Sequence, residues 1–495
     1  MLLASPEFRK YSCALHKFVP PLQGKSERAS DEAMSHADPD KPAGQPGTTA
    51  TLPGGRVALL FTVMLVTAAG NTAMQSVMPS IGTALKVEDF WISLAYTWSA
   101  LLWMICAPLW ARRSDRRGRK AMMGIGLIGF IASFGLCGLT LWLGLNGVLS
   151  GVGTLLVFAA CRSLYGGFGS AAPPSVQAYV ASRTSREERT KALSLISSSF
   201  GLGTVVGPAL APYFILPGLG LVGPFIAFTL IAVLVFIALK VWLPDDTPAF
   251  AARGDVVAAP FSTNSDSRLR KTETENENEN ENETENELAD LPGDIPKLAW
   301  RDPRLRPWVV AGLLGGHAQA AVLGIVGFLV LDRLGLRANP NAGAGPIGLV
   351  LMAGAMATLV AQWGVIPTLK LGPRASCLWG IAIAATGTGL LSVAHDLHAI
   401  TIAVAMISLG FGLFRPGFTA GASLAVSRAE QGQSAGIIAS VSGAGYIAAP
   451  AIGVWLYGHS PWIGFAVIEA LCAAVIVLGI RSMTSDVALM HRPPT

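Results

Sequence analysis

The sequence predicts an all-α membrane protein whose twelve transmembrane helices form two six-helix halves. Its composition, its recurring apolar runs and a repeat between the two parts of the chain support this fold class. Of the 495 residues, 52% are hydrophobic and 14% are charged, whereas an average soluble domain has roughly 25% charged residues. A soluble helical protein would show polar faces at helical spacing. Residues 192–239 contain no formally charged side chain, which argues against that alternative.

Twelve apolar runs are long enough to cross a bilayer. A helix rises 1.5 Å per residue, so about 20 residues cover a hydrocarbon layer of about 30 Å. The even number of spans places both chain ends on the same side. We expect the spans at 57–80, 90–111, 121–143, 150–180, 192–214, 221–243, 307–331, 345–366, 375–394, 399–426, 433–457 and 461–481.

Basic residues are concentrated in every second connection between the spans. The stretch ARRSDRRGRK, residues 111–120, holds six of them, and more occur at 183–191 and in the middle segment, whereas the connections around Asn146 and Pro217 have none. Lys and Arg gather in cytoplasmic loops. We therefore expect both termini in the cytoplasm. The polar N-terminus has no apolar stretch like a secretory signal core, which fits a bacterial inner membrane or a eukaryotic plasma membrane.

Composition also divides the chain into five parts. The middle segment contains TETENENENENETENE, which cannot bury enough apolar surface to fold. We interpret it as a solvated acidic linker, with a docking site for a basic partner as the alternative. The predicted parts are a disordered cytoplasmic tail at 1–55, a six-helix bundle at 56–243, the acidic linker at 244–306, a second six-helix bundle at 307–481, and a cytoplasmic C-terminal tail at 482–495.

A weak repeat suggests that the second bundle duplicates the first. GLGTVVGPALAPYF in the fifth predicted span and GAGYIAAPAIGVWLYG in the eleventh align without a gap, Gly203 with Gly445 and Pro208 with Pro450. Internal repeats of this kind are common in membrane transporters. Small residues let helices approach closely, so we expect these four residues and Gly207 to form a helix-packing motif.

The basic loop between spans two and three carries a recognisable motif. Asp115, Arg116, Gly118, Arg119 and Lys120 match the pattern G-x-x-x-D-R-x-G-R-R/K, although an alanine replaces its first glycine. With this motif the chain resembles the major facilitator superfamily, in particular its twelve-span drug/proton antiporter branch. The resemblance implies that the loop stabilises the outward-open state and releases during alternating access. These five residues are therefore predicted to form a gating motif that does not touch the substrate.

The resemblance extends from about residue 57 to residue 481 and includes an arginine in the fourth span. Arg162 and Gly166 match the family's arginine and glycine there, and Tyr165 replaces its glutamine. An arginine inside the membrane costs several kcal/mol unless it is paired or hydrated, so it is a candidate functional residue. We expect Arg162 and Tyr165 to contact substrate. A structural arginine bonded to backbone or hydroxyl groups is the alternative.

Few other polar groups lie within the spans. If they line one cavity, its arginines outnumber its single carboxylate, Glu469, and the cavity favours anionic, zwitterionic or neutral amphipathic compounds over strongly cationic ones. Besides Arg162 and Tyr165, the predicted substrate-binding residues are Asn71 and Gln75 in span one, His317 and Gln319 in span seven, and Arg415 in span ten.

Coupling to protons requires a side chain that gains and loses a proton during the cycle. Arginine cannot do this. Glu469 in span twelve and His317 are the plausible carriers within the spans. For both residues a purely structural role is the alternative, as a helix-edge carboxylate and as a hydrogen-bonded core histidine. Gly203, Gly207 and Pro208 also match a family motif associated with antiport.

The pattern as a whole predicts secondary active transport. We expect export of a small amphipathic organic compound, anionic or zwitterionic and drug-like or chelator-like, by alternating access in exchange for protons. Import or exchange of an organic anion is the alternative. A polytopic enzyme or sensor is a third class, but the sequence has no nucleophile–base arrangement, phosphate loop or metal-ligand cluster. We predict no metal, cofactor or nucleic acid, and a monomer whose partners are substrate, protons and lipid.

Overall fold

The computed structural model describes residues 53–181, 183, 186–244, 298–427 and 430–490, and all regular elements within them are helical. The predicted N-terminal tail up to residue 52, most of the acidic linker and the last five residues lie outside the described residues. The N-terminal half comprises α2 (Gly54–Ala84), α3 (Asp89–Arg117), α4 (Arg119–Leu145), α5 (Gly151–Gly167), η1 (Gly169–Ala171), α6 (Ala172–Ala181), α7 (Arg186–Leu210), η2 (Ala211–Phe214), η3 (Gly220–Val222) and α8 (Gly223–Trp242).

The C-terminal half follows the same plan and ends in a short additional helix. It comprises α10 (Arg306–Arg333), η4 (Leu336–Ala338), α11 (Pro340–Leu359), η5 (Val360–Val365), α12 (Ile366–Leu369), α13 (Pro373–Val393), α14 (Leu397–Leu424), α15 (Gln431–His459), α16 (Pro461–Ser482) and α17 (Asp486–Met490). The pieces α5, η1 and α6 follow one another as the fourth span, and α11, η5 and α12 as the eighth.

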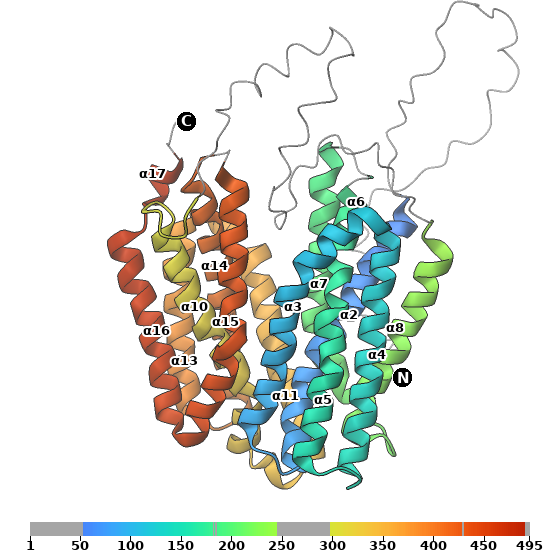
Figure 1. The fold of residues 1–495 in the computed structure, drawn as a ribbon. Helices are drawn as coiled ribbons and strands as arrows, with labels where there is room; N and C mark the ends of the chain where they lie inside the picture. The colour runs from blue at the N-terminus through green and yellow to red at the C-terminus, as the bar shows by residue number, and fades with distance from the viewer. Residues whose placement is uncertain (1–52, 182, 184–185, 245–297, 428–429, 491–495) are drawn as a thin grey trace, which may run out of the picture. The chain divides into compact units, whose positions relative to one another are not determined.

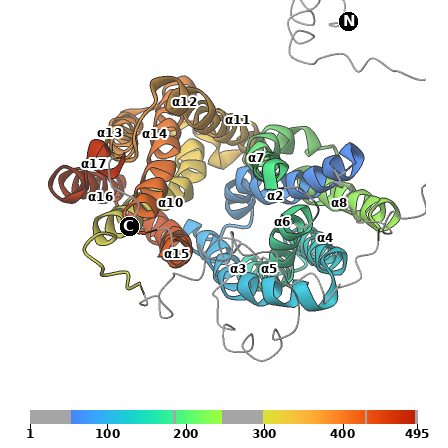
Figure 2. The ribbon, with the colours of Figure 1, turned by 90° about the horizontal axis from the view of Figure 1, so that it is seen from above.

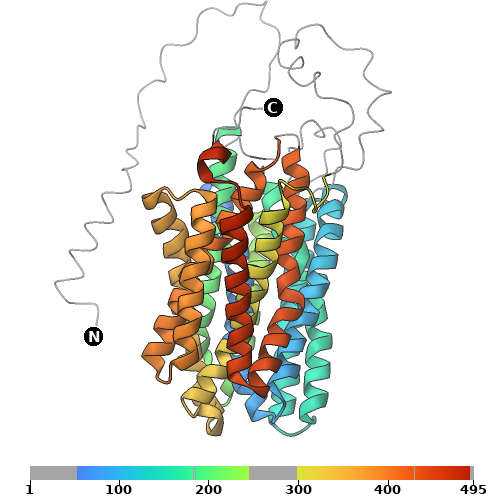
Figure 3. The ribbon, with the colours of Figure 1, turned by 90° about the vertical axis from the view of Figure 1, so that its left-hand side faces the viewer.

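The helices confirm the predicted fold class. Among the described residues, 11 helices or runs of helical pieces are long and apolar enough to cross a membrane. The long helix α7 occupies the place of the remaining predicted span. The protein is therefore an all-α, multi-span integral membrane protein, and its helices run side by side in Figure 3.

The two halves of the bundle lie next to each other, with α2–α8 on one side and α10–α17 on the other (Figures 1 and 2). They meet along two seams. In one, α3 packs against α15, and in the other α11 packs against α2 and α7. Each half thus contributes helices to both seams.

Gly203 and Gly445, which the repeat aligns, have the same structural role. Gly203 on α7 packs on α2, where an added Cβ would lie 2.7 Å from the Leu65 carbonyl oxygen. Gly445 on α15 packs on α10, where an added Cβ would lie 2.8 Å from the Gly316 carbonyl carbon. In both halves, a glycine therefore lets the fifth helix of the half approach the first. This equivalence supports the duplication.

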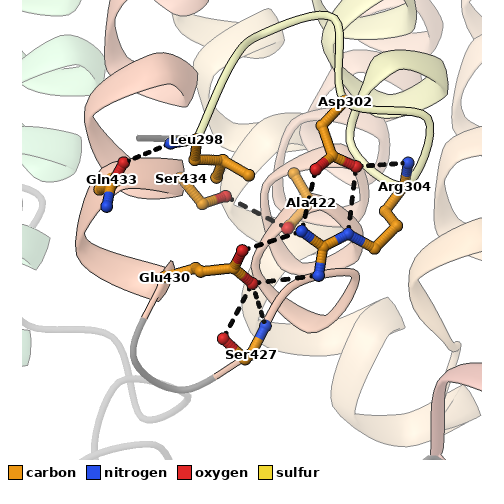
Figure 4. A network of polar contacts seen from close by, with 8 residues as sticks. All are labelled: Leu298, Asp302, Arg304, Ala422, Ser427, Glu430, Gln433 and Ser434. Atoms are coloured by element: carbon orange, nitrogen blue, oxygen red, sulfur yellow. Dashed lines mark hydrogen bonds and ion pairs between the residues drawn. The ribbon is translucent and has the colours of Figure 1, made fainter. Parts of the chain in front are cut away.

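The end of the predicted linker is folded onto the C-terminal half (Figure 4). Arg304 donates to both carboxylate oxygens of Glu430, at 3.1 and 2.8 Å, and also pairs with Asp302 at 2.9 Å. Glu430 accepts in addition from the backbone N–H of Ser427, and the Leu298 N–H donates to Gln433. Residues 298–305 therefore extend the C-terminal half beyond the boundary expected at 307.

The predicted C-terminal tail also contains a structured part. Asp486 of α17 accepts from the backbone N–H groups of Arg374 and Ala375, at 2.7 and 3.0 Å. These groups lie in the first turn of α13, where unsatisfied N–H groups and the helix dipole favour an anion. The Arg374 guanidinium in turn donates to the carbonyls of Gly479 and Ile480, near the end of α16.

Replacing Glu430 by glutamine should reduce stability only at pH values where the carboxylate is ionised. Hydrogen bonds from Arg304, followed by the Ser427 N–H, lower the pKa of Glu430 from 4.5 to about 2. Its contribution is therefore present above pH 4.5 and is lost as the pH falls toward 2. We expect a loss of about 1 kcal/mol at pH 7, because Arg304 is partly exposed. Thermal unfolding of Glu430→Gln and of the neighbouring control Arg301→Gln checks this. An equal loss at pH 7 and pH 3 would contradict it.

Candidate functional site

Arg162 on α5 is almost completely buried in the N-terminal half. Its side chain is 3% exposed. Nη2 donates to Oδ1 of Asn71 on α2 at 2.9 Å. The guanidinium carbon lies 4.7 Å from the ring centre of Tyr165 and 5.8 Å from that of Phe134. The structure thus brings together three of the predicted substrate-binding residues, Asn71, Arg162 and Tyr165.

The Arg162 guanidinium has no counter-ion in the described part of the chain. Its Nε and Nη1 atoms are buried and have no hydrogen-bond partner, and no described carboxylate forms an ion pair with it. A buried charge without a partner is costly. The ring of Trp103 packs on Tyr165 at 5.1 Å between centres and helps to fix that side of the site. Two donors of this buried guanidinium are therefore unused within the described structure.

A second site is a small, partly open pocket in the C-terminal half. Arg415 on α14 is exposed there, and its guanidinium has no partner among the described residues. The pocket combines aromatic rings with an arginine, an amide and two hydroxyl groups. Its lining residues are Gly312, Gly316 and Gln319 from α10, Phe414, Arg415 and Phe418 from α14, and Ser442 and Tyr446 from α15.

Two of the predicted polar residues lie close to these sites in sequence without an observed role in them. His317 follows the pocket residue Gly316 on α10, and its Nδ1 lies 2.7 Å from the Leu313 carbonyl oxygen. Because a carbonyl only accepts, Nδ1 carries the hydrogen and Nε2 is the atom that can take up a further proton. Gln75 is half-buried on α2, one helical turn from Asn71 and therefore on the same face.

Glu469 lies apart from the pocket. It is on α16 where this helix packs on α13, and an added Cβ at Gly389 of α13 would lie 3.8 Å from its Oε1. Oε1 is buried and has no hydrogen-bond partner in the described structure. In Figure 3, α16 is the red helix at the front, on the side away from the N-terminal half. A single cavity lined by all these polar groups would require Glu469 to lie beside the pocket residues. The structure does not place it there.

The predicted gating motif joins α3 to α4. Gly118 between the two helices has φ 89°, a left-handed conformation that favours glycine. Lys120 is 8% exposed, and its Nζ donates to the Lys240 carbonyl at 3.1 Å. That carbonyl lies near the end of α8, where the helix dipole favours a cation. The side chains of Asp115 and Arg116 lie outside the described residues, and Arg119 begins α4.

Comparison with known families identifies the chain. The sequence model of the Major Facilitator Superfamily matches residues 60–368, more than half of the protein. The chain belongs to the major facilitator superfamily. This membership confirms the resemblance drawn from the gating motif, and it assigns the protein to a family of transporters and not of enzymes.

The similar proteins within the superfamily carry several transport-related names. Multidrug resistance protein 2 of Bacillus subtilis is 28% identical over 177 residues, 36% of this chain and 40% of that protein. Sugar efflux transporter A of Dickeya chrysanthemi is 30% identical over 190 residues, 38% of this chain and 44% of that protein. The Staphyloferrin B transporter of Staphylococcus aureus is 28% identical over 155 residues, 30% and 34% of the two chains. The matches thus span less than half the length of each relative.

Solved structures support the same fold. A D-xylose-proton symporter superposes with a TM-score of 0.62 at 13% identity, covering 87% of this chain and 98% of the other. The human organic anion transporter MFSD10 gives a TM-score of 0.55 at 16% identity, covering 86% and 100%. At these identities the similarity shows the fold alone.

Within this superfamily, Asp115→Asn should slow turnover while protein level and substrate binding stay close to wild type. The reason is that a gating aspartate acts on the equilibrium between conformations through charge-assisted hydrogen bonds, which an amide replaces only weakly. We expect at least about a tenfold loss of transport rate, since a lost hydrogen bond of this kind is worth about 1.5–3 kcal/mol and each 1.36 kcal/mol is a factor of ten. Transport at a wild-type rate in this variant would remove Asp115 from the gate.

Proposed function

We propose that this protein is a secondary active transporter that exports a small amphipathic compound with an anionic group in exchange for protons. The observation that carries the proposal is Arg162, a buried cation with two unpaired nitrogens and no described counter-ion. A substrate carboxylate would complete its hydrogen bonds. The aromatic rings of Tyr165 and Phe134 beside it favour a substrate with an apolar body.

The two arginines that lack a counter-ion among the described residues belong to different halves of the bundle. Arg162 lies in the N-terminal half, and Arg415 opens into the pocket of the C-terminal half. Alternating access in this family moves one half against the other around a central site. An anionic substrate between the halves would thus have a cation available on each side. Gln319, Ser442 and Tyr446 would supply further hydrogen bonds in the pocket.

We assign the coupling proton to His317 in preference to Glu469. His317 adjoins the pocket residue Gly316 and has one ring nitrogen left for a second proton, whereas Glu469 faces α13. Exchange then requires that the proton and the substrate occupy this part of the site alternately. The Bacillus subtilis and Dickeya chrysanthemi relatives are named for multidrug resistance and sugar efflux, which supports export as the direction.

We place the protein in the cell membrane as a monomer. We assign both termini to the cytoplasm, because the basic connections lie on that side of the predicted topology. The predicted division into tail, bundle, acidic linker, bundle and tail is part of this proposal. Residues 298–305 are assigned to the second bundle on the basis of the Arg304–Glu430 contacts.

Transport in membrane vesicles of both orientations tests the proposal. The probe is a fluorescent carboxylate, with its neutral methyl ester as the matched control. Inverted vesicles with an acidic interior should accumulate the carboxylate, and vesicles from cells without the protein should not. Uptake into right-side-out vesicles alone would support the alternative, an importer of organic anions. Equal transport of acid and ester would contradict the anion site.

A further inference from the structure

An ion pair connects the two halves at one end of the bundle. Arg337 lies in η4, between α10 and α11 of the C-terminal half, and Asp89 is the first residue of α3 in the N-terminal half. Nη1 and Nη2 of Arg337 donate to the two carboxylate oxygens of Asp89, at 3.0 and 2.6 Å. Both groups are charged and the pair is bidentate, the strongest form of such a contact.

Arg337 is held in place by its own half. Its Nε donates to Oδ1 of Asp332 at the end of α10. The other oxygen of Asp332 accepts from the Tyr457 hydroxyl of α15 at 3.2 Å. Hydrogen bonds to Asp89 and Asp332 raise the pKa of Arg337 above its already high ordinary value. The guanidinium is therefore anchored on α10 and α15 and presents its remaining edge to α3.

The halves pack closely at this same end. An added Cβ at Gly327 of α10 would lie 2.5 Å from the Pro79 side chain of α2, and one at Gly343 of α11 would lie 2.6 Å from the Ser80 hydroxyl of α2. By contrast, the pocket residue Gly312 is six residues from the start of α10, near its opposite end. The bundle is thus closed where Asp89 and Arg337 meet, and the pocket lies toward the other end.

We propose that the Asp89–Arg337 pair is a clasp that holds the halves together at this end and must open once in each transport cycle. The clasp residues are positioning residues, since they set which end of the bundle is open and do not contact the pocket. The proposal goes beyond the proposed function and requires only that the protein alternates between two states. It does not depend on the substrate, the coupling ion or the direction of transport.

The exposure of the pair suits a reversible contact. The side chain of Asp89 is 20% exposed and that of Arg337 is 36% exposed. Water and salt screen a charge pair of this kind, so its net contribution is modest. We therefore expect the clasp to shift the equilibrium between the two states by about threefold to tenfold. A shift of this size favours the state in which this end of the bundle is closed. It is small enough to be reversed in each transport cycle.

Accessibility of Ser80 provides a test that needs no substrate. Ser80 is fully buried against α11 beside the clasp end. In a variant whose six native cysteines are replaced by alanine, Ser80→Cys is the single thiol. The purified protein in lipid nanodiscs is then reacted with a polar maleimide. Asp89→Asn and Arg337→Gln should each increase the labelling rate of this cysteine about threefold to tenfold.

The matched control is Arg333→Gln. Arg333 is the last residue of α10, and within the described part of the chain its side-chain hydrogen bonds go to His395 and the Ser392 carbonyl, both in the C-terminal half. Its loss should leave the labelling rate unchanged, and the charge-conserving Arg337→Lys should give an intermediate rate. High salt should increase labelling of the parent protein but not of Asp89→Asn. Unchanged labelling in Asp89→Asn and Arg337→Gln, or an equal increase in Arg333→Gln, would overturn the clasp. Neither result would bear on the anion site.

Discussion

Replacing Arg162 by glutamine should reduce kcat/KM for an anionic substrate by about 100-fold or more. Two nitrogens of the guanidinium have no hydrogen-bond partner among the described residues, and a hydrogen bond between charged partners contributes about 1.5–3 kcal/mol. At 1.36 kcal/mol per factor of ten, two such bonds account for an effect of that size. Transport of the carboxylate and of its neutral ester by wild-type and variant protein measures the effect.

The same substitution should not harm the folded state. Arg162 makes a single side-chain hydrogen bond, to Asn71, and its charge has no counter-ion in the described structure. Removing a buried, unpaired charge removes a desolvation cost, so the thermal midpoint of Arg162→Gln should equal or exceed that of the wild type. Arg415→Gln is the comparison. Its kcat/KM for the anionic substrate should fall by only about tenfold, because the Arg415 side chain is exposed. A similar loss for acid and ester, or a large loss of stability, would show that Arg162 is structural.

Replacing His317 by glutamine should abolish accumulation driven by a pH gradient and spare downhill exchange. The imidazole Nδ1 is engaged by the Leu313 carbonyl, so Nε2 is available for the coupling proton. Glutamine keeps a polar group but cannot take up a proton. Gradient-driven uptake into inverted vesicles, measured beside counterflow of labelled substrate, separates the two activities. We expect gradient-driven uptake to fall by at least about tenfold and counterflow to change by less than about twofold.

Glu469→Gln is the matched variant for this experiment, because Glu469 is the other ionisable candidate and lies on α16 against α13. It should retain gradient-driven transport. Loss of coupling in Glu469→Gln alone would move the carrier to that residue. Full gradient-driven transport by the double variant would exclude both residues and leave either uniport or another carrier, such as Asp332 near the end of α10.

Most of the helical architecture follows from local sequence. The apolar runs contain very few charged residues, so the expected spans correspond closely to the helices of the structure. Residues 298–305 and α17 were expected to be linker and tail, because they lie outside the apolar runs that are long enough to cross a membrane. They are ordered by contacts between distant residues, Arg304 with Glu430 and Asp486 with the first turn of α13, which no local pattern reveals.

The candidate site was predicted only in part, for a physical reason. A charge inside an apolar run stands out, which is how Arg162, Arg415 and Glu469 were found. The sequence gives no sign of the direction in which such a side chain points, so Glu469 was grouped with residues from which the structure separates it. Ser442 and Tyr446 are neutral and do not stand out among small apolar neighbours. Asp89 and Arg337 are 248 residues apart, and only the packing of the halves brings them together.

The most direct test of anion-selective proton exchange uses purified protein in liposomes with an acidic interior. A weak acid distributes passively away from an acidic compartment, so inward accumulation of a fluorescent carboxylate requires the protein. We predict that the carboxylate accumulates inside, that its methyl ester does not, and that a protonophore or Arg162→Gln abolishes the accumulation. Accumulation of acid and ester alike, or accumulation that persists with the protonophore, would contradict the account.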